Sequence, residues 1–466
     1  MVYTMPEFLE RRYNPQSRTI LSVISLVSYV LTKVAVTVYA GGLVFQQVFG
    51  IKELWGIDFF WIAAIGLVVL TALYTIFGGM KSVLYTSVLQ TPILLLGSLI
   101  ILVLGFKELG GWDEMMRVCG AVTVNDYDDT MTNLIRSNDD ANFPWLGALI
   151  GSAIIGFWYW CTDQFIVQRV LSGKNEMEAR RGTIFGAYLK LLPVFLFLIP
   201  GMIAFALHQK YIGAGGEGFL PMLANGTANA DAAFPTLVAK LLPAGVKGLV
   251  VCGILAALMS SLASLFNSSA MLFTIDFYKR FKPETPEKKL VGIGQIATIV
   301  IVVLGILWIP IMRSVGDVLY TYLQDVQSVL APGIAAAFLL GICWKRTSAQ
   351  GGMWGLISGM VIGLTRLGAK VYYSNAGEVA DSTFKYLFYD MNWLFFCGWM
   401  FLFCIIVVIV VSLATEAPTA EKIQGLVFGT ATKKQKAATR ASWNHWDIIH
   451  TVIILAITAA FYWYFW

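Results

Sequence analysis

A ladder of small hydroxyl and amide side chains runs through an otherwise apolar segment between Gly248 and Arg280. Its members are Ser260, Ser261, Ser264, Asn267, Ser268 and Ser269. Hydrocarbon offers such groups no water, and each unsatisfied polar group at membrane depth costs several kcal/mol. We therefore expect these side chains to face other helices, a cavity or an ion.

A cation held by oxygen atoms is one chemistry that this ladder could support. Alkali and alkaline-earth cations prefer hydroxyl and carbonyl oxygens. The small residue Ala257 lies close to Ser260 and Ser261 and would allow the close backbone approach that an oxygen cage needs. Plain helix packing through small residues is the alternative.

Ionisable residues inside apolar runs are the next candidates, because each is costly in a membrane and by default marks a pathway or a partnered site. They are Lys33, Asp163, Lys190, Asp325 and Arg366. Lys190 and Arg366 can reach an interface or pair structurally. Lys33 and Asp163 lie several residues from any expected span end, so we expect them to belong to a functional site.

Two further patterns could recognise a polyhydroxy compound. Asp163 follows the aromatic run FWYWCT, whose rings could form a stacking surface for a sugar, although such a stripe is also typical of packing. Tyr320, Gln324 and Gln327 fall at i, i+4 and i+7, on one side of a helix. Amides both donate and accept, as sugar hydroxyls require. A glutamine bond between helices is the alternative.

The elements that would position these residues are membrane-spanning helices. With about 20 apolar residues per span, the chain contains about eleven candidates. We place them near residues 19–48, 57–78, 83–106, 145–171, 183–208, 245–275, 290–312, 318–343, 352–373, 386–414 and 447–465.

Composition agrees with a polytopic all-α membrane protein. The 466 residues are 58% hydrophobic and 13% charged, whereas soluble domains hold roughly 45–50% apolar and 25% charged residues. The net charge of +5 is no signal for nucleic acid, because the basic residues sit in short loops between apolar runs. Six scattered cysteines and three histidines form neither a disulfide framework nor a metal-site spacing.

Loop charges alternate along the chain and indicate its orientation. Basic residues such as Arg11, Arg181, Lys289 and Lys434 fall in one set of loops, while the long opposite loop at 107–144 is acidic. By the positive-inside rule we expect a cytoplasmic N-terminus, and an integral protein of the plasma (inner) membrane.

The chain resembles the sodium/solute symporter family, and within it the sodium/glucose cotransporter branch, over essentially its whole length. The resemblance rests on YTMPEFL at 3–9, WYWCTDQFIVQR at 158–169, YLKLLP at 188–193, the stretch 256–276, WKR at 344–346 and WGLISG at 354–359. It implies a LeuT-like fold of two inverted five-helix repeats, with solute and sodium near the membrane midplane at broken helices.

The resemblance also implies roles for individual residues. The main sodium site (Na+) would use the carbonyl of Ala257 and the hydroxyls of Ser260 and Ser261. Gln324 would bind the solute and Tyr320 would be the outer aromatic gate. The residues expected at the solute site are Gln324, Tyr159 and Trp160 (the inner gate), Tyr320, Asp163 and Lys33. An aspartate that relatives use at a second sodium site is Ser87 here, so a second sodium is not expected.

The expected organisation is a single transmembrane transporter domain over 1–466. Residues 19–106 would be the remainder of the first repeat, which is incomplete at the N-terminus, because the family's YTMPEFL-like segment follows about three further helices. Residues 145–343 would form the second repeat and 352–466 the extra helices. We expect either a truncated product or a natural short form.

The function expected from this resemblance is sodium-coupled symport of a sugar or polyol of the glucose, galactose and inositol class, by alternating access and without catalysis. Its partners would be sodium, the solute and the lipid bilayer, and no nucleic acid. A truncated membrane receptor or regulator that binds solute without moving it is the alternative. A membrane enzyme would need a polar catalytic cluster at a span end, with Asp163 its best candidate.

Overall fold

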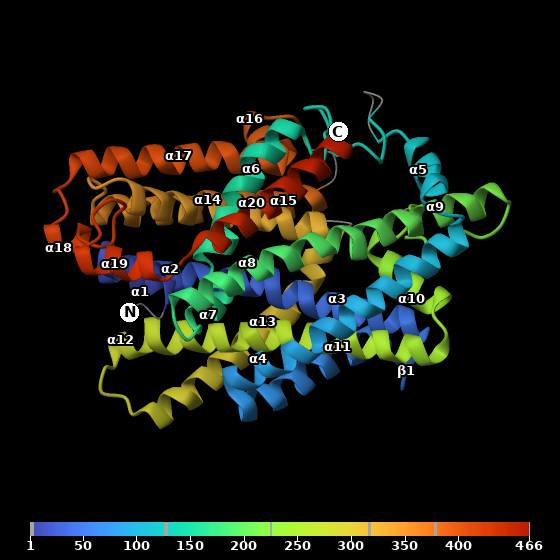
Figure 1. The fold of residues 1–466 in the computed structure, drawn as a ribbon, viewed down its shortest axis with the longest axis horizontal. Coiled ribbons are helices and arrows are strands. Elements are labelled where there is room, and N and C mark those ends of the chain that lie inside the picture. The colour runs from blue at the N-terminus through green and yellow to red at the C-terminus, as the bar shows by residue number, and fades with distance from the viewer. Residues whose placement is uncertain (1–3, 125–128, 224–225, 316–317, 377–379, 466) are drawn as a thin grey trace. The chain divides into compact units, whose positions relative to one another are not determined.

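In the computed structural model, helices form nearly every described element, and a two-stranded antiparallel ribbon is the exception (Figure 1). The structure describes all residues except 1–3, 125–128, 224–225, 316–317, 377–379 and 466. It describes no side chains at 74, 76–84, 86–87, 89 and 313–315.

The chain divides into two compact units. Unit 1 holds residues 1–35, 138–184 and 268–451, and unit 2 holds 36–137, 185–267 and 452–466. Four helices contribute residues to both units. They are α8 (Glu176–Pro193), α11 (Ala244–Met271), α20 (His445–Tyr464) and, through its first residue Ala35 alone, α3 (Ala35–Phe49).

The other elements of unit 1 include four π-helical segments, labelled η. They are α1 (Met5–Arg12), α2 (Pro15–Ser28), η1 (Tyr29–Val34), α6 (Trp145–Phe157), η2 (Trp158–Thr162), α7 (Gln164–Leu171), η5 (Leu272–Tyr278), α12 (Lys279–Phe281), α13 (Glu287–Val315), α14 (Leu319–Cys343), α15 (Ala349–Asn375), α16 (Thr383–Lys385), η6 (Tyr386–Asp390), α17 (Trp393–Ala414), α18 (Ala420–Ile423) and α19 (Lys433–Ala441).

Unit 2 contains one π-helical segment, η3, and one short 3₁₀ turn, η4, besides its helices and ribbon. Its elements are α3 (Ala35–Phe49), β1 (Glu53–Leu54), β2 (Ile57–Asp58), α4 (Phe59–Leu109), α5 (Trp112–Gly120), η3 (Val194–Leu198), α9 (Ile199–Gly213), η4 (Ala230–Ala232) and α10 (Ala233–Leu241).

Local chemistry explains several helix boundaries. Thr4 and Asn14 cap α1 and α2 with their side-chain oxygens, and each helix has a proline in its first turn, where the missing N–H costs nothing. Asp58 accepts from Phe60 N at the start of α4. That helix ends at Gly110, whose φ of +114° favours glycine.

Small residues let the central helices of unit 1 approach closely. α14, α15 and α17 pack on one another. A Cβ atom added at Gly333 of α14 would lie 2.9 Å from the Cα of Gly359 of α15, so the two backbones are in contact there. Such close approach of helices is how membrane proteins gain packing energy without a hydrophobic driving force between helices.

The all-α membrane architecture is confirmed, but the count of eleven spans is not. Nine helices of the described part of the chain are long and apolar enough to cross a membrane. The spans expected at 57–78 and 83–106 lie in one continuous helix, α4, because the stretch expected to connect them is itself helical. The span expected at 352–373 is helical as α15 but is not among the nine.

Arg12 links α1 to the end of α14. Its side chain is 1% exposed and donates to the carbonyl oxygens of Gly341 (2.7 Å), Trp344 (3.1 Å) and Thr347 (3.1 Å). Gly341 lies in the last turn of α14, where a helix leaves carbonyls without partners of its own, and Trp344 and Thr347 follow that turn. The guanidinium also places a cation at the negative end of the helix dipole.

We expect Arg12→Lys to destabilise the protein by about 2 kcal/mol, because the single ammonium of lysine cannot replace a guanidinium whose three nitrogens donate to three carbonyls. The adjacent Arg11 provides a matched control. It is exposed and pairs with Glu7 at 2.6 Å, so Arg11→Lys should cost less than about 0.5 kcal/mol. Thermal unfolding of both variants in detergent checks this prediction, and equal midpoints would contradict the capping role.

Candidate solute and ion site

The span expected at 145–171 is a broken helix. α6 runs into the π-helical segment η2, and the chain then becomes extended at Asp163 (φ −78°, ψ 119°) before α7 begins. The Asp163 side chain caps α7 by accepting from Phe165 N at 3.2 Å. Polar backbone and a charged side chain are thereby brought together inside an apolar segment, as at the discontinuous helices of transporters.

The two ionisable residues singled out from the sequence form one buried ion pair in unit 1. The Lys33 ammonium pairs with the carboxylate of Asp163, and the two side chains are 9% and 2% exposed. Tyr29 donates its hydroxyl hydrogen to Asp163 Oδ1 at 3.1 Å and accepts from Phe165 N at 3.0 Å. The carboxylate is therefore satisfied by an ammonium, a phenol and a backbone amide.

Aromatic rings surround the Lys33 ammonium. Its Nζ atom lies 4.2 Å from the ring centre of Phe165, 4.8 Å from Tyr29, 5.4 Å from Tyr159 and 6.0 Å from Trp158. Electron-rich ring faces attract a cation, most strongly where water is excluded. Two rings of the aromatic run, those of Trp158 and Tyr159, therefore help to stabilise the charge of Lys33 in the ion pair.

The two residues expected to form the inner gate lie at the edge of this cluster. The rings of Tyr159 and Trp160 meet edge to face with their centres 5.2 Å apart. Tyr159 is half-buried, whereas Trp160 is 51% exposed. Trp160 is therefore the ring of this cluster that is most open for a ring-shaped solute to contact.

The first turns of α14 carry the other expected solute residues. Gln324 Nε2 donates to the Tyr320 hydroxyl at 2.9 Å, and Tyr320 is 56% exposed. Gln327 is 6% exposed and points into the packed part of unit 1, so it does not share the accessible face. Of the three residues on the expected polar face, Tyr320 and Gln324 therefore remain accessible.

α14 packs against both η1 and η2, so the structure gathers the expected solute residues in one unit. Tyr322 makes the link, since its hydroxyl donates to the Leu31 carbonyl at 3.0 Å and accepts from Trp308 Nε1 at 2.6 Å. π-helical segments are rare and are often found at functional sites. Here they carry Lys33, Tyr159 and Trp160.

The serine ladder lies along α11. Ser260 is 8% exposed, while Ala257 and Ser261 are half-buried. Two members of the ladder also form hydrogen bonds within α11. Ser264 donates to the Ser260 carbonyl and Asn267 to the Ala263 carbonyl, so their own helix satisfies them.

The remaining ionisable residues of the spans are partnered as well. Asp325 of α14 pairs with Lys370 of α15 and lies 3.6 Å from Arg366. Arg366 is fully buried, donates to the Met391 carbonyl at 2.7 Å and lies 4.1 Å from the ring centre of Phe396. This fits the structural pairing that the sequence left open for Arg366.

Sequence reasoning missed two members of these clusters, and each had a signal. Tyr29 precedes Lys33 by one helical turn and could have been found from that spacing. Lys370 lies four residues after Arg366, and that spacing was its signal. It also lies near the end of the span expected at 352–373, where a charged side chain is less costly. The side chain of Ser87, compared above with a second sodium site, lies outside the described residues.

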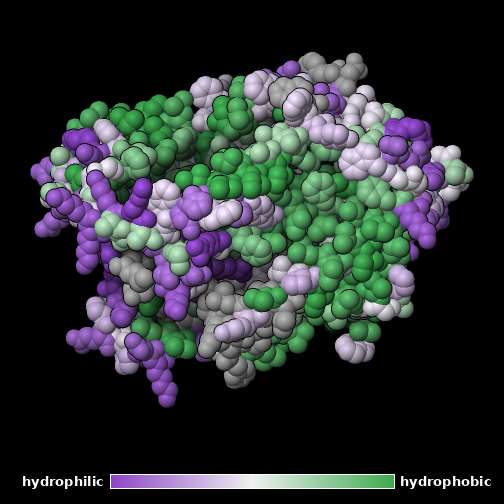
Figure 2. Space-filling model, viewed as in Figure 1, coloured by the Kyte–Doolittle hydropathy of each residue, from purple (hydrophilic) through white to green (hydrophobic). Residues whose placement is uncertain are grey.

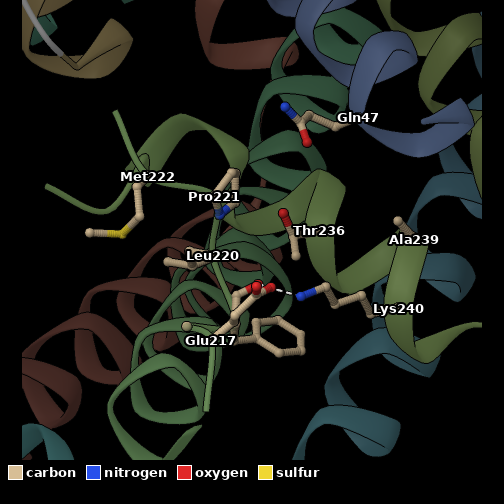
Figure 3. A pocket seen from close by; sticks show the side chains of 10 residues that line it. Gln47, Glu217, Leu220, Pro221, Met222, Thr236, Ala239 and Lys240 are labelled. Atoms are coloured by element: carbon tan, nitrogen blue, oxygen red, sulfur yellow. Dashed lines mark hydrogen bonds between the residues drawn. The ribbon is translucent and has the colours of Figure 1, made fainter. Parts of the chain in front are cut away.

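Unit 2 holds a pocket that none of the expected site residues line (Figure 3). It measures about 540 Å³ and lies between the 217–222 loop, α10 and Gln47 of α3. Lys240 donates to the Phe219 carbonyl at 2.7 Å, and His208 Nδ1 accepts from Leu220 N at 3.0 Å. These bonds hold the loop in place.

Comparison with known proteins gives consistent results. The model of the sodium:solute symporter family matches residues 1–359. A sodium/mannose cotransporter of Bos taurus is 35% identical over 486 residues, which cover 100% of this chain and 80% of the relative. The sodium/myo-inositol cotransporter 2 of Homo sapiens is 36% identical over 92% of this chain and 64% of its own length.

A sodium/glucose cotransporter 4 of Mus musculus is 35% identical, over 92% of this chain and 63% of its own length. The chain thus spans somewhat under two thirds of the inositol and glucose relatives. Among solved structures, a Na+-coupled sialic acid symporter in a substrate-bound outward-open state aligns with a TM-score of 0.64. It is 20% identical and covers 90% of this chain and 78% of its own, so it supports the shared fold.

Proposed function

The chain belongs to the sodium:solute symporter family, and on that premise we propose that it carries a sugar or polyol across a membrane together with sodium. The observation that carries the proposal is the identity of about 35% to mannose, myo-inositol and glucose cotransporters over 92% or more of this chain. The solute belongs to the glucose, galactose and inositol class.

The solute site lies where η1, η2 and α14 meet. Gln324 and Tyr320 supply an amide and a hydroxyl that can exchange hydrogen bonds with a polyol. Tyr159 and Trp160 form the inner gate, and the exposed ring of Trp160 offers a stacking face. Lys33 and Asp163 contribute by holding the broken helix in shape, because their charges are already engaged with each other.

The sodium site uses the carbonyl of Ala257 and the hydroxyls of Ser260 and Ser261, on one face of α11. Bound sodium raises the affinity for solute, and by linkage solute raises the affinity for sodium by the same factor. An inward sodium gradient then drives uptake by alternating access, so the protein is a transporter and not an enzyme.

The domain organisation that accompanies this function is one transmembrane transporter domain over residues 1–466. Within it, 19–106 belongs to the first repeat, 145–343 forms the second inverted repeat and 352–466 adds further helices. The protein lies in the plasma (inner) membrane with residue 1 on the cytoplasmic side, surrounded by lipid and without a nucleic-acid partner. The alternation of basic loops supports this orientation.

Uptake by reconstituted protein tests the function directly. Proteoliposomes with more sodium outside than inside should accumulate radiolabelled myo-inositol, glucose or mannose. Dissipating this sodium gradient should abolish accumulation. Gln324→Ala should reduce uptake by weakening solute binding while leaving the protein folded. Saturable solute binding without sodium-driven accumulation would identify a receptor and overturn the proposal.

A further inference from the structure

The short helix α19 is a basic surface with every residue from Lys433 to Ala441 exposed. Lys433, Lys436 and Arg440 fall at i, i+3 and i+7, so they lie on one side of the helix, and Lys434 extends that side. Between Glu421 and Asp447 the sequence contains no acidic residue. Four cations thus stand close together without a carboxylate on their own segment.

Several hydrogen bonds hold α19 in place. Thr432 and Gln435 form a reciprocal capping box at its first turn, with bonds of 3.2 and 2.8 Å. Just past its end, Ser442 accepts a 3.0 Å hydrogen bond from Arg180 of α8. Upstream, Phe428 N donates to the carbonyl of Ile342 at the end of α14. α19 is therefore a fixed part of unit 1.

The position of α19 places its charges beside a membrane-spanning helix. α20 begins at His445, and only three residues separate it from the end of α19. The most apolar 18-residue stretch of α20 contains no buried residue. Arg440 lies 5.1 Å from the ring centre of Trp443, and Trp446 is 56% exposed. Tryptophan favours the interface between hydrocarbon and water, so this junction marks the membrane surface.

The end of unit 1 that carries α19 also carries α1. Lys422 of α18 donates to the carbonyl of Glu10 of α1 at 2.9 Å, and this bond joins α18 to α1. On the face shown in Figure 2, hydrophilic residues gather where α1, α18 and α19 lie. In the orientation proposed above, this end faces the cytoplasmic leaflet, where anionic lipids attract juxtamembrane cations.

We propose that α19 binds the headgroups of anionic phospholipids next to α20. A run of exposed charge is often no more than a solvated face, but this one is fixed in place, lacks acidic residues and adjoins an aromatic membrane boundary. Basic residues beside a membrane are each attracted to anionic headgroups, so four together make a substantial binding surface. The proposal does not depend on the identity of the transported solute.

The test measures binding of acyl-labelled phosphatidylglycerol, and of phosphatidylcholine with the same label, to the full chain in a neutral detergent by fluorescence anisotropy. Changing Lys433, Lys434, Lys436 and Arg440 to glutamine should weaken phosphatidylglycerol binding about tenfold or more and leave phosphatidylcholine binding unchanged. In the unaltered protein, near-molar salt should weaken phosphatidylglycerol binding and spare phosphatidylcholine.

A matched control removes four exposed cations from α12, the first turn of α13 and the connection between these helices. The variant changes Lys279, Lys282, Lys288 and Lys289 to glutamine, and that segment also contains Glu284 and Glu287. It should keep phosphatidylglycerol affinity within about twofold, because cations that share their segment with carboxylates attract an anionic headgroup less. An equal loss in both variants would show that only net charge matters and would overturn the proposal.

Two further arms exclude other anions and misfolding. If poly-glutamate or inorganic phosphate displaces the labelled lipid as effectively as unlabelled phosphatidylglycerol does, the surface binds acidic protein or free phosphate, and the lipid proposal is wrong. Lysine-to-arginine changes at 433, 434 and 436 should retain binding. If the glutamine variant unfolds, the salt dependence of the unaltered protein decides, since salt-insensitive binding contradicts the proposal.

Discussion

Ser261→Ala is expected to raise the sodium concentration needed for half-maximal solute uptake roughly tenfold or more, with a smaller change in maximal rate at saturating sodium. A hydroxyl that coordinates a cation is a charged interaction of about 1.5–3 kcal/mol, and alanine cannot replace its oxygen. Initial rates of uptake into proteoliposomes, measured over a range of sodium concentrations, give this quantity.

Ser269→Ala is the matched control for this prediction. Ser269 lies on the same helix, and its buried hydroxyl has no hydrogen-bond partner among the described residues, so alanine removes an unsatisfied group. We expect unchanged sodium dependence and equal or slightly higher thermal stability in this variant. Sodium activation of Ser261→Ala that superimposes on that of the unaltered protein would remove Ser261 from the sodium site.

Lys33→Met is expected to destabilise the protein by about 3–5 kcal/mol, because it leaves the buried carboxylate of Asp163 without its counter-ion. Tyr29 and Phe165 would still donate hydrogen bonds, but neither carries a positive charge. The broken helix between η2 and α7 would lose one of its contacts with η1, while the hydrogen bonds of Tyr29 would remain. Thermal unfolding in detergent and the yield of folded protein measure the effect.

The double variant Lys33→Met with Asp163→Asn separates charge from packing. Asparagine caps a helix as well as aspartate does, so α7 keeps its first turn, and no uncompensated charge remains. We expect most of the lost stability to return. Lys190→Met is the control, because the Lys190 side chain is exposed and should cost little. A double variant no more stable than Lys33→Met would show that the pair acts through something other than its charge balance.

Sequence patterns located most of the charges that matter but not their partners. Lys33 and Asp163 were recognisable because each is costly in an apolar run, yet 130 residues separate them, and only folding brings η1 beside η2. Similarly, Arg366 and Asp325 were recognisable as misplaced charges. That Lys370 shares the same carboxylate depends on the packing of α15 against α14.

The serine ladder shows a second limit of the sequence pattern, which does not predict the hydrogen-bond partner of each hydroxyl. Its composition predicts polar contacts, but a hydroxyl on a helix can reach the carbonyl one turn earlier as well as a neighbouring helix. Ser264 donates to the carbonyl one turn earlier, and the spacing of the serines does not predict this bond. The expected spans at 57–78 and 83–106 differ from the structure for a related reason. Glycines and a lysine near residue 80 suggest a break, whereas the backbone of α4 stays helical there.

The sequence by itself determined the membrane class, the helical architecture and the family, because these follow from long apolar runs and from motifs that are local along the chain. Tertiary structure alone decided that Tyr29 satisfies Asp163, that aromatic rings enclose Lys33, and that Gln327 is buried while Tyr320 stays exposed. The physical reason is that a buried charge only requires compensation. Which distant groups supply it depends on how the helices pack, and spacing along the chain does not encode that.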